Sequence, residues 1–315
     1  MAATRKPNEL YLTRVFDAPV HLVWHAWVDE DQVGQWWGPR GFTLTTHSKD
    51  VRVGGTWVYT MHGPDGKDYP NITTYLEVEA YSKLVYDHGA TATTPPMFRV
   101  TVHFTEQGGK TRMDMTMALA TAEAAQATKA FIKKAGGEST WDRLAEYVHE
   151  RNGADRFVIN RTFDAPIERV FEMWTDPANL ANWMGPTGST TRFFRGNITT
   201  GGSTFWCMDS AHGVMYGQAK YLEVTRPTRL VYTQNFCDEQ QNVIRHPMAP
   251  TWPEKMLTTV EFTAEDEGRT RITLTWEVYG DATPEERATF HQAKGGMTMG
   301  WTGSFDKLEE ALAHP

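Results

Sequence analysis

Cysteine and long apolar segments are both scarce in this chain of 315 residues. The two cysteines, Cys207 and Cys237, exclude a disulfide framework or a zinc cluster, and we expect both to be reduced thiols. No stretch approaches the roughly 20 apolar residues that span a membrane, and residues 1–8 lack the apolar run of a signal peptide. The sequence therefore predicts a cytoplasmic protein.

Positive charge is also in short supply. The chain carries 31 lysines and arginines against 39 aspartates and glutamates, which gives a net charge of −8 at pH 7. Nucleic acids and anionic membranes are bound by basic faces, and no basic patch is visible in the sequence. Neither nucleic acid nor a membrane is therefore expected as a partner.

Motifs of known catalytic chemistry are missing as well. The chain has no Gly-x-Ser-x-Gly nucleophile elbow, no His-Glu-x-x-His metal site and no Gly-x-x-x-x-Gly-Lys phosphate loop. Most of the histidines have no metal-type spacing with Cys, Asp or Glu. No metal and no cofactor are predicted, the catalytic residues are unknown, and the sequence leaves open whether the chain is an enzyme.

What the chain does contain is a duplication. The segments Arg14–Pro19 and Arg161–Pro166 are identical at five of six positions and lie 147 residues apart. The same landmarks follow each of them in the same order: Trp27 and Trp174, Trp36-Trp37-Gly38-Pro39 and Trp183-Met184-Gly185-Pro186, Gly54-Gly55 and Gly201-Gly202. This register predicts two tandem domains of one fold, residues 1–152 and 153–315.

Each copy has the pattern of a strand, two short helices, a run of strands and a long C-terminal helix. Residues 9–16 alternate as a half-buried strand does, and Asp17 and Pro19 then open a helix, with the acid as its cap and the proline in its first turn. From residue 42 onward, strands separated by turn glycines predict an antiparallel meander with one apolar face. Residues 121–151 indicate a helix broken near residues 136–137.

The second copy differs in one insertion. It carries about 12 extra residues between the strands that include Tyr232 and Thr259, among them the proline-rich segment 246–253. We expect this segment to form a loop over the mouth of the sheet. Farther on, residues 283–286 predict the start of the final helix, with a proline in the first turn and a capping-box glutamate.

In this order of elements the chain resembles the helix-grip fold of the START/Bet v 1-like (SRPBCC) superfamily. Within it the chain is most similar to the group named for the activator of Hsp90 ATPase (AHSA1-like), whose helix signature matches Gly300-Trp301, Phe305 and Leu308. The resemblance implies an α+β protein of two tandem domains, each a curved antiparallel sheet wrapped around a long C-terminal helix. The first copy departs from the signature, because Gly137 aligns with Trp301 and Trp141 with Phe305.

The resemblance also implies a cavity between sheet and helix for an apolar or aromatic small molecule. Methionine and aromatic side chains suit such a wall because they make few hydrogen-bond demands, although the same stripes also occur as plain core. His88 and Gln234 place a polar group at matched positions on an otherwise apolar strand face. The candidate ligand-binding residues are Trp57, Tyr59, Met61, His88, Met115, Met117, Trp206, Met208, Gln234, Trp252, Trp276 and Trp301.

The two cavities are expected to be unequal, with the first the more open. Met117 and Gly137 of the first copy align with Trp276 and Trp301 of the second, so the first copy lacks two indoles at these positions. Trp57, which is present only in the first copy, compensates for one of them. Buried aromatic bulk competes with a ligand for volume. The segment 246–253, which includes a tryptophan, is expected to cap the second cavity and slow exchange there.

Three functions compete at this point. We favour binding, with conversion left open, of an apolar or aromatic small molecule. The alternatives are a chaperone-regulating interaction protein of the Hsp90-activator type, and a pseudo-dimer in which one copy has lost its ligand. The linker Arg151–Asp155 spans at most about 18 Å, so we also predict that the two halves touch as an intramolecular pseudo-dimer.

Overall fold

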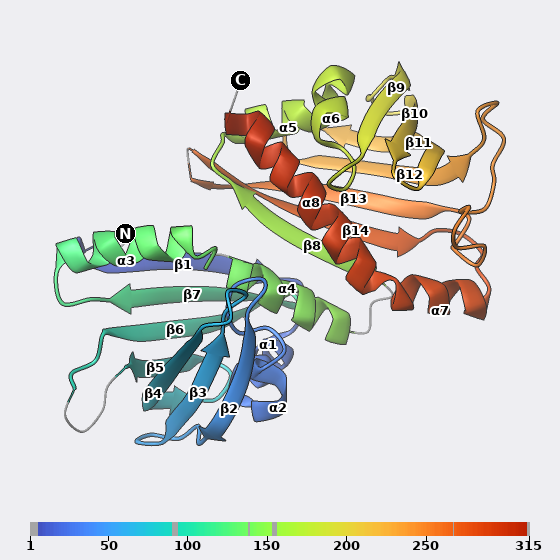
Figure 1. Cartoon of the computed structure of the whole chain (residues 1–315). Helices are drawn as coiled ribbons and strands as arrows, with labels where there is room; N and C mark the ends of the chain where they lie inside the picture. Colours follow the sequence, from blue (N-terminus) through green and yellow to red (C-terminus); the bar gives the residue numbers. More distant parts are fainter. Residues whose placement is uncertain (1–5, 90–93, 138, 153–155, 267, 314–315) are drawn as a thin grey trace. The chain divides into compact units, whose positions relative to one another are not determined.

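The computed structural model describes residues 6–89, 94–137, 139–152, 156–266 and 268–313 (Figure 1). The chain separates into two compact units, residues 1–154 and 155–315, called domain 1 and domain 2 below. The predicted boundary between residues 152 and 153 adjoins residues 153–155, which lie outside the described residues. Among the described residues, no helix is both long and apolar enough to cross a membrane.

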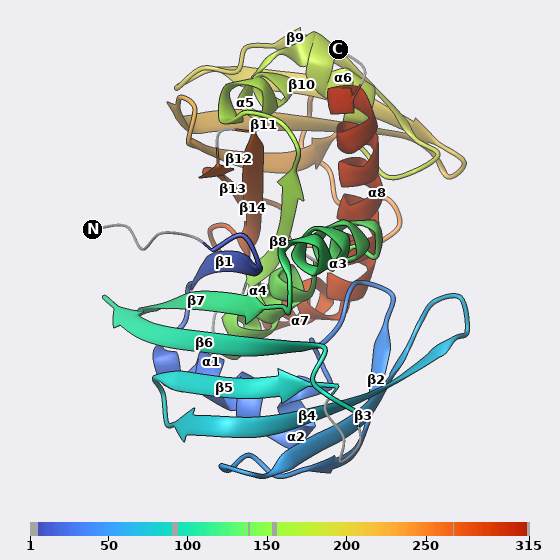
Figure 2. The same cartoon turned by 90° about the vertical axis from the view of Figure 1, so that its left-hand side faces the viewer.

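Domain 1 contains one antiparallel sheet in the strand order β1-β7-β6-β5-β4-β3-β2 (Figure 2). All seven strands come from this domain, so neither copy completes the sheet of the other. The elements are β1 (Glu9–Phe16), α1 (Val20–Val28), α2 (Glu30–Val33), β2 (Thr43–Lys49), β3 (Thr56–His62), β4 (Asp68–Glu79), β5 (Lys83–His88), β6 (Phe98–Gln107), β7 (Lys110–Ala118), α3 (Ala122–Lys134) and α4 (Ser139–Arg151).

Domain 2 repeats this topology with the strand order β8-β14-β13-β12-β11-β10-β9. The α+β architecture and the tandem repeat predicted from the sequence are therefore confirmed. The elements are β8 (Arg156–Phe163), α5 (Ile167–Thr175), α6 (Pro177–Trp183), β9 (Thr190–Gly196), β10 (Ser203–Ser210), β11 (Gly213–Thr225), β12 (Arg229–Cys237), β13 (Met256–Asp266), β14 (Arg269–Val278), α7 (Pro284–Gln292) and α8 (Lys294–Ala313).

The first helix of each domain begins differently from the prediction. Pro19 itself is the N-cap of α1, in an extended conformation, and its own side chain makes no capping hydrogen bond. Asp17 is too early in the chain to reach the free N–H groups of the first turn, and it lies 3.5 Å from the Lys110 ammonium instead. The N–H of Val20 donates to the Glu106 carboxylate on β6 at 2.8 Å. A tertiary contact therefore replaces the local cap that the sequence suggested.

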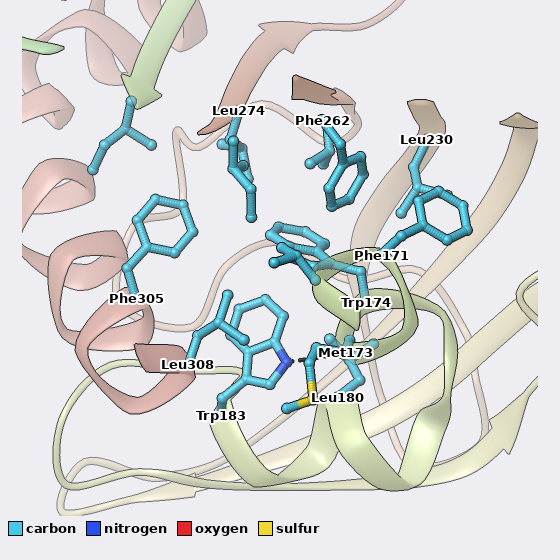
Figure 3. Packing of buried hydrophobic residues seen from close by; sticks show 14 of the residues in the cluster. Phe171, Met173, Trp174, Leu180, Trp183, Leu230, Phe262, Leu274, Phe305 and Leu308 are labelled. Carbon is cyan, nitrogen blue, oxygen red and sulfur yellow. Dashed lines mark hydrogen bonds between the residues drawn. The ribbon is translucent and has the colours of Figure 1, made fainter. Parts of the chain in front are cut away.

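The repeated tryptophans fix the two short helices to each other. The Trp36 indole N–H donates to the carbonyl of Ala26 at 2.9 Å. The Trp183 indole N–H likewise donates to the carbonyl of Met173 at 2.9 Å (Figure 3). Both indoles are fully buried. The same hydrogen bond in the same place explains why this residue occurs in both copies, since an unpaired buried indole N–H is costly.

The core of each domain lies between the sheet and the C-terminal helix. In domain 1, Leu144 and Val148 of α4 are fully buried against the sheet, as the predicted stripe requires. In domain 2, Phe305 and Leu308 of α8 do the same. The predicted capping box between Thr283 and Glu286 is present, but it starts the separate helix α7, and the final helix α8 begins only at Lys294.

Candidate functional site

Domain 2 encloses a cavity of about 750 Å³. Its walls are the inner face of the sheet, the two short helices α5 and α6, the first half of α8 and the loop between β12 and β13. This volume falls within the range of about 300–1,000 Å³ that is usual for small-molecule sites. The cavity continues from the domain's packed core, part of which is drawn in Figure 3.

All six candidate residues from the second copy line this cavity. They come from three strands, from α8 and from the loop: Trp206 and Met208 on β10, Gln234 on β12, Trp252 in the loop, Trp276 on β14 and Trp301 on α8. Their positions on the inner face follow from the strand alternation that the sequence showed.

The corresponding residues of domain 1 are packed into a solid core. Trp57, Tyr59 and Met115 are buried members of that core, and Met61 and Met117 pack against it. The expectation that the first cavity is the more open is therefore wrong, because the large cavity is in domain 2.

A different match between the C-terminal helices accounts for part of this error. Trp141 stacks on Trp27 with ring centroids 5.8 Å apart and planes 18° apart, and Trp301 stacks on Trp174 at 6.0 Å and 11°. Trp141 is therefore the structural counterpart of Trp301, whereas the sequence had placed Gly137 there. The indole counted as missing from domain 1 is present.

Two further indoles fill the space that is open in domain 2. Trp37 and Trp57 of domain 1 pack edge to face at 5.1 Å, and Trp57 also stacks on Tyr59 at 4.0 Å. The matched residues of domain 2 are the smaller Met184 and Thr204, which both line the cavity. Replacing an indole with a threonine leaves room that no neighbour occupies.

The remaining space beside Trp57 is taken by a lysine. The Lys49 ammonium lies 3.7 Å from the centroid of the Trp57 ring and donates a hydrogen bond to the Tyr75 hydroxyl at 3.1 Å. Burial lowers the pKa of Lys49 to about 7, while the ring beneath the amine favours its charged form. Gly196 stands at the matched position of domain 2 and brings no side chain.

His88 lies on the inner face of β5 but within packed surroundings. Its ring stacks on Phe98 of the neighbouring strand at 4.6 Å and 12°. Burial lowers the pKa of His88 to about 4, so the side chain is neutral at pH 7. Its counterpart Gln234 faces the cavity, so the polar group repeated in the sequence has a cavity beside it in domain 2.

The cavity wall of domain 2 is mainly apolar, with a few polar side chains between the apolar ones. Tyr221 and Tyr232 lie with ring centroids 5.2 Å apart, and burial raises the pKa of both phenols well above their ordinary value. Glu254 brings a carboxylate to the lining, which holds no lysine or arginine among the described residues. A cavity of this kind disfavours an anionic ligand, since nothing compensates a buried negative charge.

Two hydrogen-bond donors of the lining lack partners. The indole N–H groups of Trp174 and Trp276 are buried and donate to no acceptor within the part of the chain that the structure describes. Trp27 has the same unpaired N–H in domain 1, whereas Trp276 matches Met117 and is specific to domain 2.

The predicted loop closes one side of the cavity. His246, Trp252 and Pro253 all contribute to its wall. The loop is held to α7 by an ion pair between Arg245 and Glu286 and by a hydrogen bond of 2.8 Å between the hydroxyls of Thr251 and Thr289. The segment thus lies where the sequence placed it.

His246 is oriented by its own loop. Its Nδ1 accepts from the N–H of Met248 at 3.1 Å, which leaves the proton of the neutral ring on Nε2. Burial lowers the pKa of His246 below its ordinary value. No group of three His, Cys, Asp or Glu side chains is placed to hold a metal ion in the described segments.

The family model described as activator of Hsp90 ATPase homolog 1-like protein matches residues 17–149 and 164–313. The chain belongs to this family. Each of its two domains carries one match, and the architecture is the helix-grip fold of the SRPBCC superfamily. A search of curated proteins gives no significant match.

Among solved structures, the chain is similar to protein Ms6760 from Mycobacterium smegmatis, at 28% identity and a TM-score of 0.42 over 46% of this chain and 93% of that one. It is similar to a protein from Arthrobacter aurescens at 25% identity and a TM-score of 0.43, over 47% and 90%. It is also similar to the di-domain ARO/CYC BexL of the BE-7585A biosynthetic pathway at 13% identity and a TM-score of 0.39, over 98% and 99%.

Within the second family segment, the sequence reasoning missed part of the cavity wall. Gly296 and Gly300 of α8 line the cavity, together with Trp174, Tyr221 and Tyr232. The signal was available, because α8 contains four glycines although each glycine inside a helix costs about 1 kcal/mol relative to alanine. A helix that tolerates this cost has a reason other than helix stability.

Proposed function

We propose that domain 2 binds a neutral apolar or aromatic small molecule that carries a hydrogen-bond acceptor, and that domain 1 does not bind one. The observation that carries this proposal is the cavity of about 750 Å³ with apolar walls and no lysine or arginine in its lining among the described residues. The side-chain amide of Gln234, which lines the cavity, can donate a hydrogen bond to an acceptor on the ligand. Whether a reaction follows binding is left open.

Domain 1 is proposed as a non-binding copy because its interior is filled. Trp37, Trp57 and Tyr59 occupy the place of the cavity with ring contacts between 4.0 and 6.4 Å. A ligand there would have to displace buried aromatic surface, which costs far more than filling a vacant cavity.

The test is isothermal titration of the whole chain with 9-fluorenone, a neutral flat ketone. We expect one equivalent bound per chain. Copying the fill of domain 1 into domain 2, by Thr204→Trp or separately by Met184→Trp, should weaken binding at least tenfold because the new indole occupies the ligand's volume.

Thr204→Val is the matched control, since it keeps the volume of the residue and should leave the stoichiometry unchanged. Near-ultraviolet circular dichroism checks that each variant is folded. Full binding by both filled variants would show that the cavity of domain 2 is not the site, and two equivalents per chain would contradict the proposal that domain 2 alone binds.

A further inference from the structure

Lys49 of domain 1 is a partly buried amine held by aromatic side chains. It is the last residue of β2, which is the edge strand of the sheet. Its nitrogen lies 3.7 Å from the centroid of the Trp57 ring and donates to the Tyr75 hydroxyl at 3.1 Å. Buried lysines are usually paired with a carboxylate. Among the described residues, however, the carboxylates of Glu30 and Asp29 act on the charge of Lys49 only through space.

We propose that the ε-amine of Lys49 is a covalent binding site for a small aldehyde, and that the Tyr75 hydroxyl supplies the proton that the carbonyl oxygen takes up. The product is an imine at the edge of the sheet of domain 1. This site is separate from the cavity of domain 2 and does not depend on the function proposed above.

The surroundings keep the amine of Lys49 ready to react. Burial lowers its pKa to about 7, and the opposing effect of Glu30 and Asp29 is smaller. Asp29 is itself engaged, since it accepts from the Gln32 amide at 2.6 Å. An ordinary lysine has a pKa of about 10.4 and is almost entirely charged at pH 7. Only a neutral amine has the lone pair that attacks a carbonyl carbon, and about half of Lys49 is neutral at this pH.

Tyr75, on β4, is placed and protonated for its role. Its side chain is only 3% exposed, and burial raises its pKa, so the phenol keeps its proton at pH 7. The hydroxyl oxygen accepts from the Lys49 amine, so its own O–H can donate to another acceptor. Burial also keeps the neighbouring phenol of Tyr59 neutral. The amine therefore faces neutral oxygens and an aromatic ring.

The reaction of Lys49 with an aldehyde balances without a further reagent. The lone pair of the amine forms a C–N bond to the carbonyl carbon as the C=O π bond breaks. The oxygen takes the phenol proton of Tyr75, and the nitrogen returns a proton to the phenolate 3.1 Å away. A second cycle of the same two transfers breaks the C–O bond. Amine and aldehyde thus give imine and water.

The aromatic side chains around Lys49 define which aldehyde fits. The Trp57 ring favours a cation above it, so it stabilises a protonated imine as it does the ammonium. Trp37 and Tyr59 pack on Trp57 with ring centroids 5.1 and 4.0 Å away, which leaves room for few atoms beyond the amine. A short unbranched aldehyde meets both conditions. Domain 2 has Gly196 at the matched position and no amine.

The test incubates the full chain with propanal, reduces imines to stable secondary amines with borohydride, and locates the added propyl groups by peptide mass spectrometry. Lys83 is the internal reference, because its ammonium is bonded to Glu77 at 2.6 Å and its pKa is raised. At pH 7.5 Lys49 should be labelled at least tenfold faster than Lys83, since far more of it is neutral. Its labelling should be half-maximal near pH 7 and level off at higher pH, whereas that of Lys83 should keep rising.

Two matched variants test the hydroxyl. Tyr75→Phe keeps the ring and should slow labelling of Lys49 at least fivefold, because no phenol then supplies the proton. Tyr86→Phe removes a hydroxyl from a buried ring 6.2 Å from that of Tyr75 and should leave the rate unchanged. A branched probe, 2,2-dimethylpropanal, should label Lys49 at least tenfold more slowly than propanal does, relative to Lys83. Near-ultraviolet circular dichroism checks that both variants are folded.

Equal labelling rates of Lys49 and Lys83 would overturn the proposal, because Lys49 would then be an ordinary packed lysine. A half-maximum at about pH 10 would overturn it for the same reason. Equal effects of Tyr75→Phe and Tyr86→Phe would overturn the role of Tyr75 as proton donor. Equal relative rates with the two aldehydes would overturn the restriction to small, unbranched ones.

Discussion

In both domains a tryptophan of the C-terminal helix stacks on a tryptophan of the first helix. The pairs are Trp141 on Trp27 and Trp301 on Trp174, with nearly parallel planes in each. The domains differ in what lies beside this stack. Domain 1 has further indoles there, and domain 2 has a cavity of about 750 Å³.

The difference depends on few residues. Trp37 and Trp57 of domain 1 match Met184 and Thr204 of domain 2, while the strand order of the two sheets is the same. The space beside the stacked pair is therefore filled or open according to the size of these wall residues. A duplicated chain can keep one domain filled and stable while the other provides a cavity.

The helix before the C-terminal helix also differs between the domains. In domain 1, α3 lies along the edge strand β1 and buries only Ala125 (Figure 1). In domain 2, α7 packs beside the cavity loop, with the rings of Phe290 and Trp252 5.9 Å apart. The domain with the cavity is thus also the one in which a helix supports a closing loop.

The largest expected effect comes from removing the stacked tryptophans. Trp27→Ala and Trp174→Ala should each destabilise their own domain by about 3–5 kcal/mol, through lost burial and a new void. Trp27 should be the more costly, since it packs on four other rings, whereas Trp174 already borders the cavity. Hydrogen exchange followed by mass spectrometry reports the stability of each domain in the intact chain.

A larger loss of stability from Trp174→Ala than from Trp27→Ala would contradict this prediction. It would mean that the cavity beside Trp174 does not reduce the packing energy that this side chain contributes. Exchange in the unaltered domain serves as the internal control for each variant.

Most of the fold could be predicted from the sequence because the duplication checked each element twice. The strands at residues 9–16 and the helix break near residues 136–137 are found where the patterns placed them. The cap of α1 could not be predicted, since the carboxylate that meets its first N–H belongs to Glu106, on a distant strand.

The prediction that the cavity of domain 1 is the more open of the two is wrong, because the large cavity is in domain 2. The sequence alignment placed Gly137 at the position of Trp301. The stacking geometry shows that Trp141 is the counterpart of Trp301. A sequence alignment does not determine which turn of the C-terminal helix packs on the first helix. The helices α4 and α8 begin at different distances along the chain from the strand before them. The sequence shows that Trp37 of domain 1 is replaced by Met184 in domain 2. Only the three-dimensional structure shows that Met184 and Thr204 line the same cavity.

The pH dependence of stability offers a second, smaller contrast between the domains. Burial lowers the pKa of His88 to about 4, whereas the unfolded chain binds this proton near pH 6.5. The contribution of neutral His88 is therefore complete above pH 6.5 and is lost as the pH falls from 6.5 toward 4. Domain 1 should lose up to about 2 kcal/mol of stability from this group between pH 7 and pH 5.

The variant His88→Gln, which copies Gln234 of domain 2, should remove this part of the pH dependence. Urea unfolding of both proteins at pH 7 and pH 5 measures it as the difference between their losses, so that other acid-titrating groups cancel. Identical losses in the two proteins would mean that His88 takes up its proton without disturbing the fold.

The smallest expected effect concerns the loop that closes the cavity of domain 2. Arg245 joins this loop to Glu286 of α7, and the arginine is about half exposed, so the ion pair contributes less than about 1 kcal/mol. Glu286 keeps its capping-box bond from the N–H of Thr283 at 2.8 Å when the arginine is replaced, so α7 should remain folded. Arg245→Gln should therefore loosen the loop alone and raise the dissociation rate of bound fluorenone about two- to fivefold in stopped-flow measurements. As a control, Arg169→Gln removes the ion pair between Arg169 and the more exposed Glu172, both on α5 and outside the loop, and should leave that rate unchanged. An equal effect of the two variants, or none from Arg245→Gln, would show that the loop does not control exchange.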